Sequence, residues 1–436
     1  MRFWTRIGSL FGLIALTAAV VTPPAGASPS AAAPDSFYSY TGSTALTELA
    51  PGTVLKTRTV AYHILSIPVP LTVVQLLYRG TDQVGGATAN VTSVVLPPLR
   101  LGPPKVVAYQ SAYDSLNPAD EPSRVIAGGL TLGGVLPSAE TALIAPLLLQ
   151  GYTVVVADTE GPDADFAAGP EYGQNTLDSL RASYASPATG IGSTAKAALL
   201  GYSGGAIATE WAAEMAPTYA PDVNRHLIGA GLGGVLVDPA HNLHYVSGSL
   251  AWSGVLPMAV VGVARAFHID LTPYANSYGR SLLAKMQDAS IISALGQYPG
   301  LTWSDMALPQ YSSPESIPIY VQAVNQLIMG TGGTPTAPLF IGQGANGLLE
   351  GTSGSTPGIG PGDGVMIAGD VRSLAREYCG RGVRVQYQQY DALSHTTSLV
   401  PWAPAVLSWI DARFAGLRAP QNCSSIQPGN SLAPIS

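Results

Sequence analysis

The stretch "ALLGYSGGAIATEWAAEM", residues 198–215, decides the fold. Small apolar residues lead without interruption into a Gly-Tyr-Ser-Gly-Gly motif at residues 201–205. Apolar side chains then recur at helical spacing, at Ile207, Trp211 and Met215. This pattern predicts a buried strand, a very tight turn that carries a serine, and a helix that begins directly after the turn.

The Gly-x-Ser-x-Gly spacing is typical of a nucleophile elbow, in which a serine lies at the sharp turn between a strand and a helix. Gly201 and Gly205 stand two positions either side of Ser203, where the turn leaves no room for side chains. The turn would lift the Ser203 hydroxyl above the sheet edge and aim the helix N-terminus at the site. We therefore predict a catalytic nucleophile; the alternative is an incidental serine in a Gly-rich turn.

Other apolar runs have the character of strands in the same sheet, at residues 106–114, 152–161 and 226–238. Helical patterns separate several of them, for example at 175–183 and 207–216. Near-continuous apolar strands suit a parallel sheet that is covered on both faces. The alternation of strand and helix predicts an α/β fold with a mostly parallel sheet.

The alternation stops after Asp238, where helix-like apolar segments follow without an obvious strand. Strand patterns return at 337–344 and 384–391. We therefore expect an α/β core in two parts, separated by a helical cap and followed by a tail. The corresponding ranges are 53–238 and 336–425 for the core, 239–335 for the cap and 426–436 for the tail.

The first 27 residues have the features of a secretory signal peptide. Two arginines precede a short apolar run at 10–21, and Ala25-Gly26-Ala27 offers a cleavage site. Because the run is too short to cross a membrane comfortably, we expect export rather than anchoring. The mature extracellular protein would begin at Ser28, with a flexible lead-in over 28–52.

Composition excludes several classes of function. Charged residues make up 11% of the 436 residues, against roughly 25% in an average soluble domain. The net charge is −7 and basic residues form no run, so nucleic-acid binding is not expected, because phosphates require clustered Lys and Arg. His241 and His244 form an H-x-x-H pair without an obvious third ligand, so no metal site is predicted. No sequence motif implies a cofactor or a stable protein partner.

A serine nucleophile needs a general base, which in this type of fold is a histidine near the end of the chain. Of the six histidines, only His268 and His395 lie well beyond the strand that follows the elbow. His395 follows the last strand and precedes a terminal helix, whereas His268 follows no strand. We therefore predict His395 as the base.

The acid that orients the histidine should follow a strand between the serine and the histidine. The strand at 337–344 meets this condition, and three carboxylates follow it: Glu350, Asp363 and Asp370. Asp363 lies among glycines just before a helix, whereas Asp370 lies inside the expected helix. Asp363 is the favoured acid, with Asp370 and Glu350 as alternatives.

Two backbone N–H groups should form an oxyanion hole. Gly204, directly after the nucleophile, is expected to supply one, and the Tyr113–Asp114 region of the loop at 108–123 the other.

Cys379 and Cys423 are the only cysteines, so an exported chain is expected to join them in one disulfide; two separate thiols are the alternative. Asn90 begins an Asn-Val-Thr glycosylation sequon.

Five segments resemble, in order and spacing, the secretory lipases related to Candida lipase A. They are "YRGTDQVGGATANVTSVVLPP" (78–98), "AYQSAYDS" (108–115), "GYTVVVADTEGPDADFAAG" (151–169), "GYSGGAIATEWAAEMAPTYAP" (201–221) and "YCGRGVRVQYQQYDALSH" (378–395). The resemblance covers most of residues 40–425. It implies an α/β-hydrolase with a helical cap that acts on carboxylic esters, often triacylglycerols.

Matched position by position, the resemblance implies Ser203 as nucleophile, Asp363 as acid and His395 as base. It also implies that Asp114 and Gly204 supply the oxyanion amides. The chain departs from the family in two places. The Gly-rich loop before Asp363 is longer than expected, and residues 119–123 lack a cysteine that some relatives carry.

These observations lead to one function and two alternatives. We expect a secreted serine hydrolase, a triacylglycerol lipase or esterase that forms an acyl-enzyme on Ser203. Its substrate would be a lipid or a small ester, and the sequence does not specify whether it acts at a lipid–water interface. One alternative is an acyltransferase that uses the same three side chains. The other is a catalytically silent lipid-binding protein built on a hydrolase scaffold.

Overall fold

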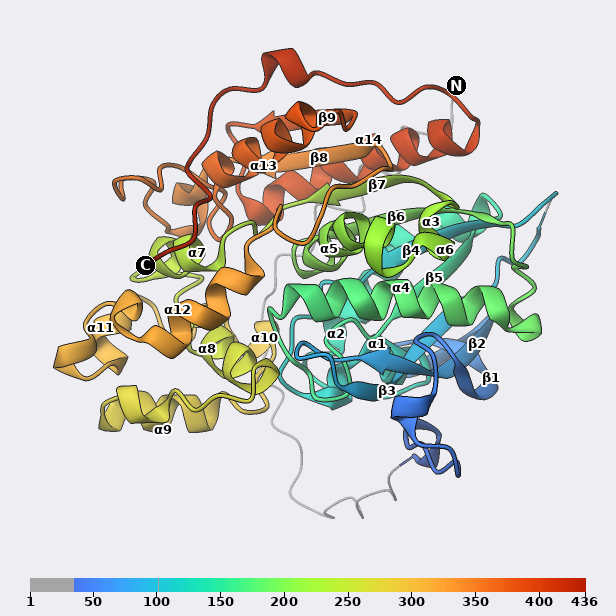
Figure 1. Ribbon diagram of the computed structural model, residues 1–436, viewed down its shortest axis with the longest axis horizontal. Coiled ribbons are helices and arrows are strands. Elements are labelled where there is room, and N and C mark those ends of the chain that lie inside the picture. Colours follow the sequence, from blue (N-terminus) through green and yellow to red (C-terminus); the bar gives the residue numbers. More distant parts are fainter. Residues whose placement is uncertain (1–34, 101) are drawn as a thin grey trace.

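A computed structural model describes residues 35–100 and 102–436 (Figure 1). The predicted signal peptide lies outside the described residues. Among the described residues, no helix is long and apolar enough to cross a membrane.

A nine-stranded sheet lies at the centre, in the order β1-β2-β3-β5-β4-β6-β7-β8-β9. In this order, each pair of neighbours from β5 to β9 is parallel. At the other edge of the sheet the pairing is antiparallel, between β1 and β2, β2 and β3, and β3 and β5. This arrangement confirms the predicted α/β fold with a mostly parallel sheet. The strands are β1 (Val54–Ile64), β2 (Ile67–Thr81), β3 (Ala87–Val95), β4 (Lys105–Gln110), β5 (Thr153–Ala157), β6 (Lys196–Tyr202), β7 (Leu227–Gly233), β8 (Leu339–Gly344) and β9 (Val385–Tyr390).

The antiparallel strands β1 to β3 were not among the strands expected from sequence. β1 is only partly buried, so it lacks the continuous apolar run that marks the central strands. The turn between β1 and β2 places Leu65 and Ser66 at positive φ (48° and 64°). Hairpins usually use Asn or Gly at such positions, so this turn carries no recognisable sequence signal.

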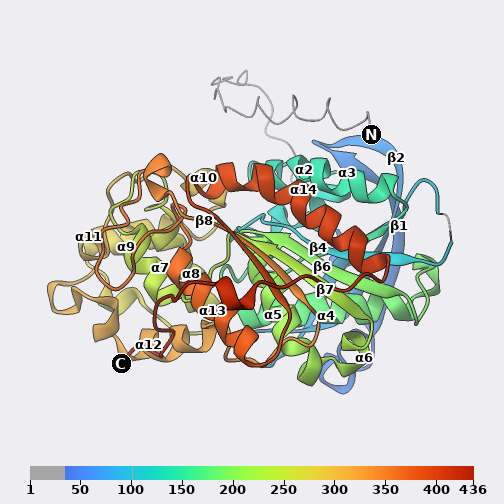
Figure 2. The same ribbon diagram turned by 90° about the horizontal axis from the view of Figure 1, so that it is seen from above.

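Helices cover both faces of the sheet (Figure 2). One face packs against α4 (Gly169–Ala185), α5 (Gly204–Tyr219) and α13 (Ala368–Gly380). The other face packs against α1 (Pro122–Ile126), α3 (Thr141–Leu149) and α14 (His395–Phe414). The short helices α2 (Val135–Ala139) and α6 (Pro221–Asn224) complete the core. Because β6 is buried along nearly its whole length, the elbow at its end is held from both sides.

Residues 239–335 contain helices and no β-strand, and every residue of this range is described. They lie together at one end of the molecule (Figure 1) and share their own apolar core, which includes Leu243, Leu256 and Ile317. The helices are α7 (Pro239–Val246), α8 (Val255–Ala266), α9 (Ser277–Lys285), α10 (Ile291–Ala294), α11 (Trp303–Met306) and α12 (Pro318–Val324). This segment is called the cap below.

The ends of the described chain pack against the core. Residues 36–38 and 46–48, expected to be a flexible lead-in, form 3-10 helices, and Phe37 is buried in a small apolar cluster with Leu77 and Val91. Burial of this ring gives the segment a fixed place that its Ser-, Ala- and Pro-rich composition does not reveal. Asn90, the sequon residue, is buried and donates to the carbonyl of Asp158, so the folded chain does not expose it for glycosylation.

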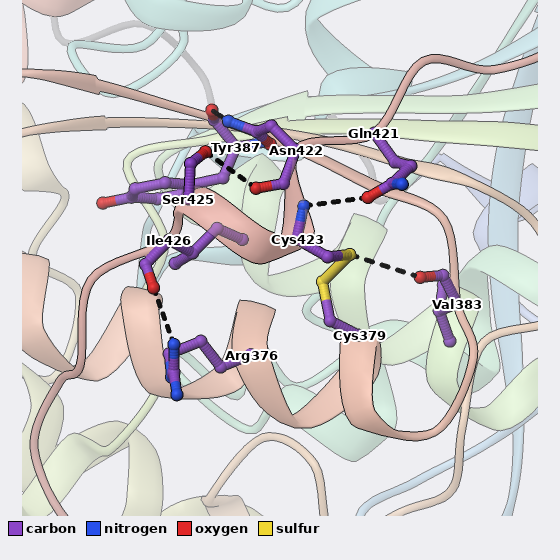
Figure 3. The surroundings of a disulfide bond; sticks show 9 residues. All are labelled: Arg376, Cys379, Val383, Tyr387, Gln421, Asn422, Cys423, Ser425 and Ile426. Carbon is purple, nitrogen blue, oxygen red and sulfur yellow. Dashed lines mark hydrogen bonds between the residues drawn. A yellow bond between two sulfur atoms is a disulfide. The ribbon is translucent and has the colours of Figure 1, made fainter.

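The predicted disulfide joins Cys379, on α13, to Cys423, just before the tail, with Cα atoms 5.7 Å apart (Figure 3). Beside it, Arg376 donates to the carbonyl of Ile426 at 2.7 Å. Farther along, Asn430 donates to Asp370, and Asn325 of the cap donates to the carbonyl of Ile435 at 2.9 Å. The tail therefore runs from the core to the cap, as Figure 1 shows.

Candidate active site

The turn between β6 and α5 holds Ser203 in an unusual backbone conformation, with φ of 56° and ψ of −123°. A non-glycine residue adopts such angles only where its surroundings impose them. A Cβ at Gly201 would lie 2.1 Å from the carbonyl oxygen of Gly205, and a Cβ at Gly205 would lie 2.1 Å from that of Gln110. The two flanking glycines are therefore required by the close approach of the backbone.

Ser203, His395 and Asp363 form a hydrogen-bonded chain. His395 Nε2 lies 2.8 Å from Ser203 Oγ, and His395 Nδ1 lies 2.9 Å from Asp363 Oδ2. A carboxylate only accepts hydrogen bonds, so Nδ1 of the neutral ring carries the proton and Nε2 accepts from the serine hydroxyl. The three side chains favoured by the sequence analysis thus meet in one place.

The Asp363 carboxylate is fixed by further donors. Its Oδ1 accepts from the N–H groups of Val365 (3.1 Å) and Met366 (2.8 Å). Its Oδ2 also accepts from Gln343 Nε2 at 2.8 Å. The backbone N–H of His395 donates to the Asp363 carbonyl at 2.8 Å, which ties the loop that carries Asp363 to the start of α14. Gln343 lies next to the last residue of β8 and gave no signal in the sequence, because a lone Gln in an apolar strand resembles an ordinary surface residue.

His395 is buried, and burial alone would lower its pKa. The negative charges of Asp363 and Glu350 and the carboxyl group of Asp114 act in the opposite direction, and the net result is a pKa above the usual value. The edge of the Trp252 ring also contacts the imidazole, with ring centroids 5.3 Å apart. His395 is thus shielded from water and surrounded by acidic groups.

The alternative acids occupy other positions. Asp370 accepts from His241 at 3.1 Å and from Asn430 at 2.6 Å, in a separate cluster beside the tail. Glu350 accepts from the backbone N–H (2.9 Å) and hydroxyl (2.6 Å) of Thr396, the residue after His395. Glu350 therefore lies beside the base without replacing Asp363 on its ring nitrogen.

The remaining candidate histidines lie outside this chain of hydrogen bonds. His244 pairs with Glu315 and His241 with Asp370, so the H-x-x-H residues point to different partners. His268 is exposed just beyond the end of α8. Among the described residues, no group of His, Cys, Asp and Glu is arranged to hold a metal ion.

The loop after β4 brings Asp114 against the elbow. Its φ is 35°, and a Cβ at Gly204 would lie 1.7 Å from Asp114 Oδ1, so a side chain at 204 would displace the Asp114 carboxyl group. Burial raises the pKa of Asp114 to about 8, although the nearby His395 lowers it. Among the described residues, neither the Asp114 nor the Gly204 backbone N–H has a hydrogen-bond acceptor.

Two buried glutamates hold this loop, and no sequence motif pointed to either of them. Glu140 accepts from the Ala112 N–H at 2.8 Å and from the Ser111 hydroxyl at 2.5 Å. Glu160 accepts from the Ser115 N–H at 3.2 Å. Asp114 is thus anchored on both sides, which explains how a non-glycine residue keeps a positive φ.

An apolar cavity extends from Ser203 and Asp114 into the cap. Apart from those two residues, Asn242 and the hydroxyl of Tyr320, its walls are hydrophobic. The cap contributes most of them, among others Leu243, Leu256, Ala259, Val260 and Leu271. A cavity of this chemistry accepts an alkyl chain and offers little to a charged ligand.

A sequence model of the family described as "Secretory lipase" matches residues 128–350 and 359–422. The chain belongs to the secretory lipase family. Lipase 1 of Candida albicans is 32% identical over 362 residues, which cover 80% of this chain and 73% of that protein. A protein of Mycobacterium tuberculosis described as a probable inactive lipase is also 32% identical, over 84% of this chain and 79% of its own.

This secretory lipase also resembles solved structures. The closed state of Candida antarctica lipase A matches with a TM-score of 0.76 and 26% identity, over 92% of this chain and 91% of that one. The rice cell wall degrading esterase LipA of Xanthomonas oryzae matches with a TM-score of 0.62 and 16% identity, over 85% of this chain and 100% of that one, which shows the fold alone. The family and its lipase relatives make this protein a lipase or esterase hydrolase with an α/β-hydrolase fold.

Proposed function

We propose that this secretory lipase is exported and hydrolyses triacylglycerols and related esters through an acyl-enzyme on Ser203. The observation that carries the proposal is the hydrogen-bonded chain of Ser203, His395 and Asp363 at the mouth of an apolar cavity. The chain of hydrogen bonds supplies a nucleophile, and the cavity supplies a place for the acyl group.

Acylation begins when His395 Nε2 removes the Ser203 proton and Oγ attacks the ester carbonyl. Asp363 holds the imidazole in the required tautomer and stabilises the imidazolium that forms. The N–H groups of Gly204 and Asp114 bind the oxyanion. His395 then gives its proton to the leaving alcohol, and a water molecule repeats the sequence on the acyl-enzyme to release the fatty acid.

The raised pKa of Asp114 suits this role. Since the pKa is about 8, the carboxyl group is mostly neutral at pH 7. A carboxylate at this position would repel the oxyanion, whereas a neutral carboxyl group does not. Burial of Asp114, which raises its pKa, therefore also avoids electrostatic repulsion of the oxyanion in the transition state.

A catalytically silent protein is the main alternative, and a relative described as a probable inactive lipase gives it weight. Against it stands the complete arrangement of hydrogen bonds, including the four donors on Asp363. An acyltransferase would use the same acyl-enzyme and differ only in the acceptor. Product analysis separates it from a hydrolase.

The decisive experiment compares the mature protein with Ser203→Ala and, as a control, Ser304→Ala, which changes an exposed serine of the cap. The substrates are p-nitrophenyl esters from acetyl to palmitoyl and an emulsified triacylglycerol. We expect the Ser203 variant to lose kcat/KM by about a thousandfold or more and the control to match the parent. A folded parent without activity on any ester would contradict the proposal, and a predominance of transesterified product would favour the acyltransferase.

N-terminal sequencing of the protein in the medium tests export, with Ser28 as the expected first residue.

A further inference from the structure

The Glu350 side chain lies where three separate parts of the molecule meet. It ends the short 3-10 helix Gly347–Glu350, in the loop after β8. Its Oε1 accepts from the backbone N–H and the hydroxyl of Thr396, at the start of α14. Its Oε2 accepts from Trp252 Nε1 at 2.6 Å, and Trp252 belongs to the cap. One carboxylate thus connects the loop of the acid, the helix of the base and the cap.

The neighbouring backbone makes room for this arrangement. Gly364, next to Asp363, has a φ of 130°. A Cβ at this position would lie 2.9 Å from Glu350 Oε2 and 3.1 Å from Trp252 Nε1. A side chain at 364 would therefore push the carboxylate and the indole apart. At this position the Gly-rich loop before α13 therefore needs a glycine, which leaves room for the carboxylate and the indole to meet.

The indole held by Glu350 forms part of the site. Trp252 is buried, lines the apolar cavity and contacts His395 edge-on, with the ring planes at 84°. The indole thus packs beside the imidazole, which is itself buried. A low local dielectric strengthens the attraction between the imidazolium and nearby carboxylates.

On these contacts, and resting on the proposed ester hydrolysis, we propose that Glu350 is a positioning residue for His395. It holds Trp252 against the imidazole, and its negative charge stabilises the imidazolium formed during the reaction. It touches neither the substrate nor the reacting atoms. The cap thereby contributes to the catalytic base as well as to the acyl cavity.

Other titratable groups also face His395. Asp363 approaches from the loop before α13, and Asp114 from the loop after β4. Tyr202, at the end of β6, packs against the imidazole with ring centroids 5.2 Å apart. Burial would raise the pKa of Glu350, but the hydroxyls of Ser394 and Thr396 and the positive charge of His395 hold it below the usual value, so Glu350 is ionised when His395 titrates.

The charge of Glu350 should shift the pH dependence of the reaction in one direction. His395 must be neutral to act as a base, so the reaction rate falls as the pH drops through the pKa of His395. Loss of the Glu350 charge makes the imidazolium less stable and lowers that pKa. Glu350→Gln should therefore move the acid limb of the pH profile to lower pH, by about half a unit to one unit. A purely structural residue would change the rate without moving the limb.

The test measures the rate at which diethyl p-nitrophenyl phosphate labels Ser203, as a function of pH. This reaction needs the serine and its base but no ester hydrolysis. The variants are Glu350→Gln and a matched control, Glu377→Gln, which removes a surface carboxylate that pairs with Arg381 on α13. We expect the acid limb to move down only in Glu350→Gln. A limb that stays in place or moves up overturns the proposal.

Two further variants keep the proposal testable. If Glu350→Gln does not fold, Glu350→Asp keeps the charge but withdraws it by one methylene, and a smaller downward shift is expected; an unchanged limb overturns the proposal.

Trp252→Phe keeps a ring but removes the donor to Glu350. If Glu350 holds the indole, the effects of Trp252→Phe and Glu350→Gln on the labelling rate are less than additive. Strict additivity would contradict the coupling. A parent that is labelled at Ser203 but hydrolyses no ester would refute only the proposed function.

Discussion

The elbow in the core and the cavity wall in the cap contribute to the same site in different ways. Around Ser203, positions are set by short contacts between backbone atoms and by directional hydrogen bonds to Asp363 and His395. In the cap, almost every group that faces the cavity is apolar, and apolar contacts have no preferred direction. Under the proposed function, the core would therefore fix the chemistry, whereas the cap would determine which acyl chain fits. Changes in the core should abolish the reaction, and changes in the cap should alter its selectivity.

The largest effect is expected for Asp363→Asn. An amide can donate to the imidazole and so favours the wrong tautomer, for which a loss in kcat of about 10⁴-fold is typical. The matched control is Asp370→Asn, the alternative acid, which should stay within about threefold of the parent because the Asp370 carboxylate hydrogen-bonds to His241 and Asn430, in a cluster separate from Ser203 and His395. Steady-state kinetics on p-nitrophenyl butyrate would measure both. Equal losses in the two variants would contradict the assignment of the acid.

The next effect compares two glycines that have equally close neighbours. A Cβ at Gly205 would lie 2.1 Å from the Gln110 carbonyl oxygen, and one at Gly262, on α8 of the cap, 2.2 Å from the Phe166 carbonyl oxygen. Each substitution by Ala should lower the free energy of unfolding by about 1–3 kcal/mol.

Only Gly205→Ala should also reduce activity on acetyl esters, because only that change displaces the elbow. Chemical denaturation gives the stabilities, and p-nitrophenyl acetate hydrolysis gives the activities. If Gly262→Ala were equally inactive on this short ester, the proposed division between core and cap would be wrong.

A smaller effect is expected for Ala259→Trp in the cap. Ala259 lines the cavity, so an indole there would occupy space needed by a long chain. The ratio of kcat/KM for palmitoyl over butyryl esters should fall about tenfold, which corresponds to about 1.4 kcal/mol. Ala264→Trp is the control, since Ala264 lies on the same helix but does not line this cavity. A fall in the ratio with both variants would show that the cap changes as a whole.

The smallest effect on activity is expected for the disulfide, which lies in the core but outside both the elbow and the cap. Replacing both Cys379 and Cys423 by Ser removes a link across 44 residues and should cost about 2–4 kcal/mol. For a chain of this size, Tm should fall by about 2–5 °C. Hydrolysis at 25 °C should remain at the level of the parent. A large loss of activity at that temperature would mean that the tail supports the site directly.

The core was more accessible to prediction from sequence than the cap, for a physical reason. A tight turn such as that at Ser203 requires glycine at defined positions, and buried parallel strands require continuous apolar runs, so both are visible in the sequence. The proposed acid and base follow from strand order in the same way. Cap helices as short as α10 and α11 have only four residues each and leave no comparable pattern.

The residues that the sequence did not single out act through contacts across the fold. Gln343, Glu140 and Glu160 are ordinary polar residues until the structure brings their partners to them. Glu350 was considered as an acid, and its actual place beside Thr396 and Trp252 depends on a contact between cap and core. Pairs of residues about 100 positions apart carry no periodic signal in a single sequence.

The chain ends on the cap. Although the disulfide anchors the tail to α13, Ile435 exchanges two backbone hydrogen bonds with the side chain of Asn325 near the end of the cap, both at 2.9 Å. A fusion partner, purification tag or solid support attached after Ser436 would therefore pull on the part of the enzyme that lines the acyl cavity. An immobilised preparation coupled through its C-terminus would differ from the free enzyme mainly in chain-length preference. Coupling through a surface lysine such as Lys196, at the start of β6, would leave that end of the molecule untouched.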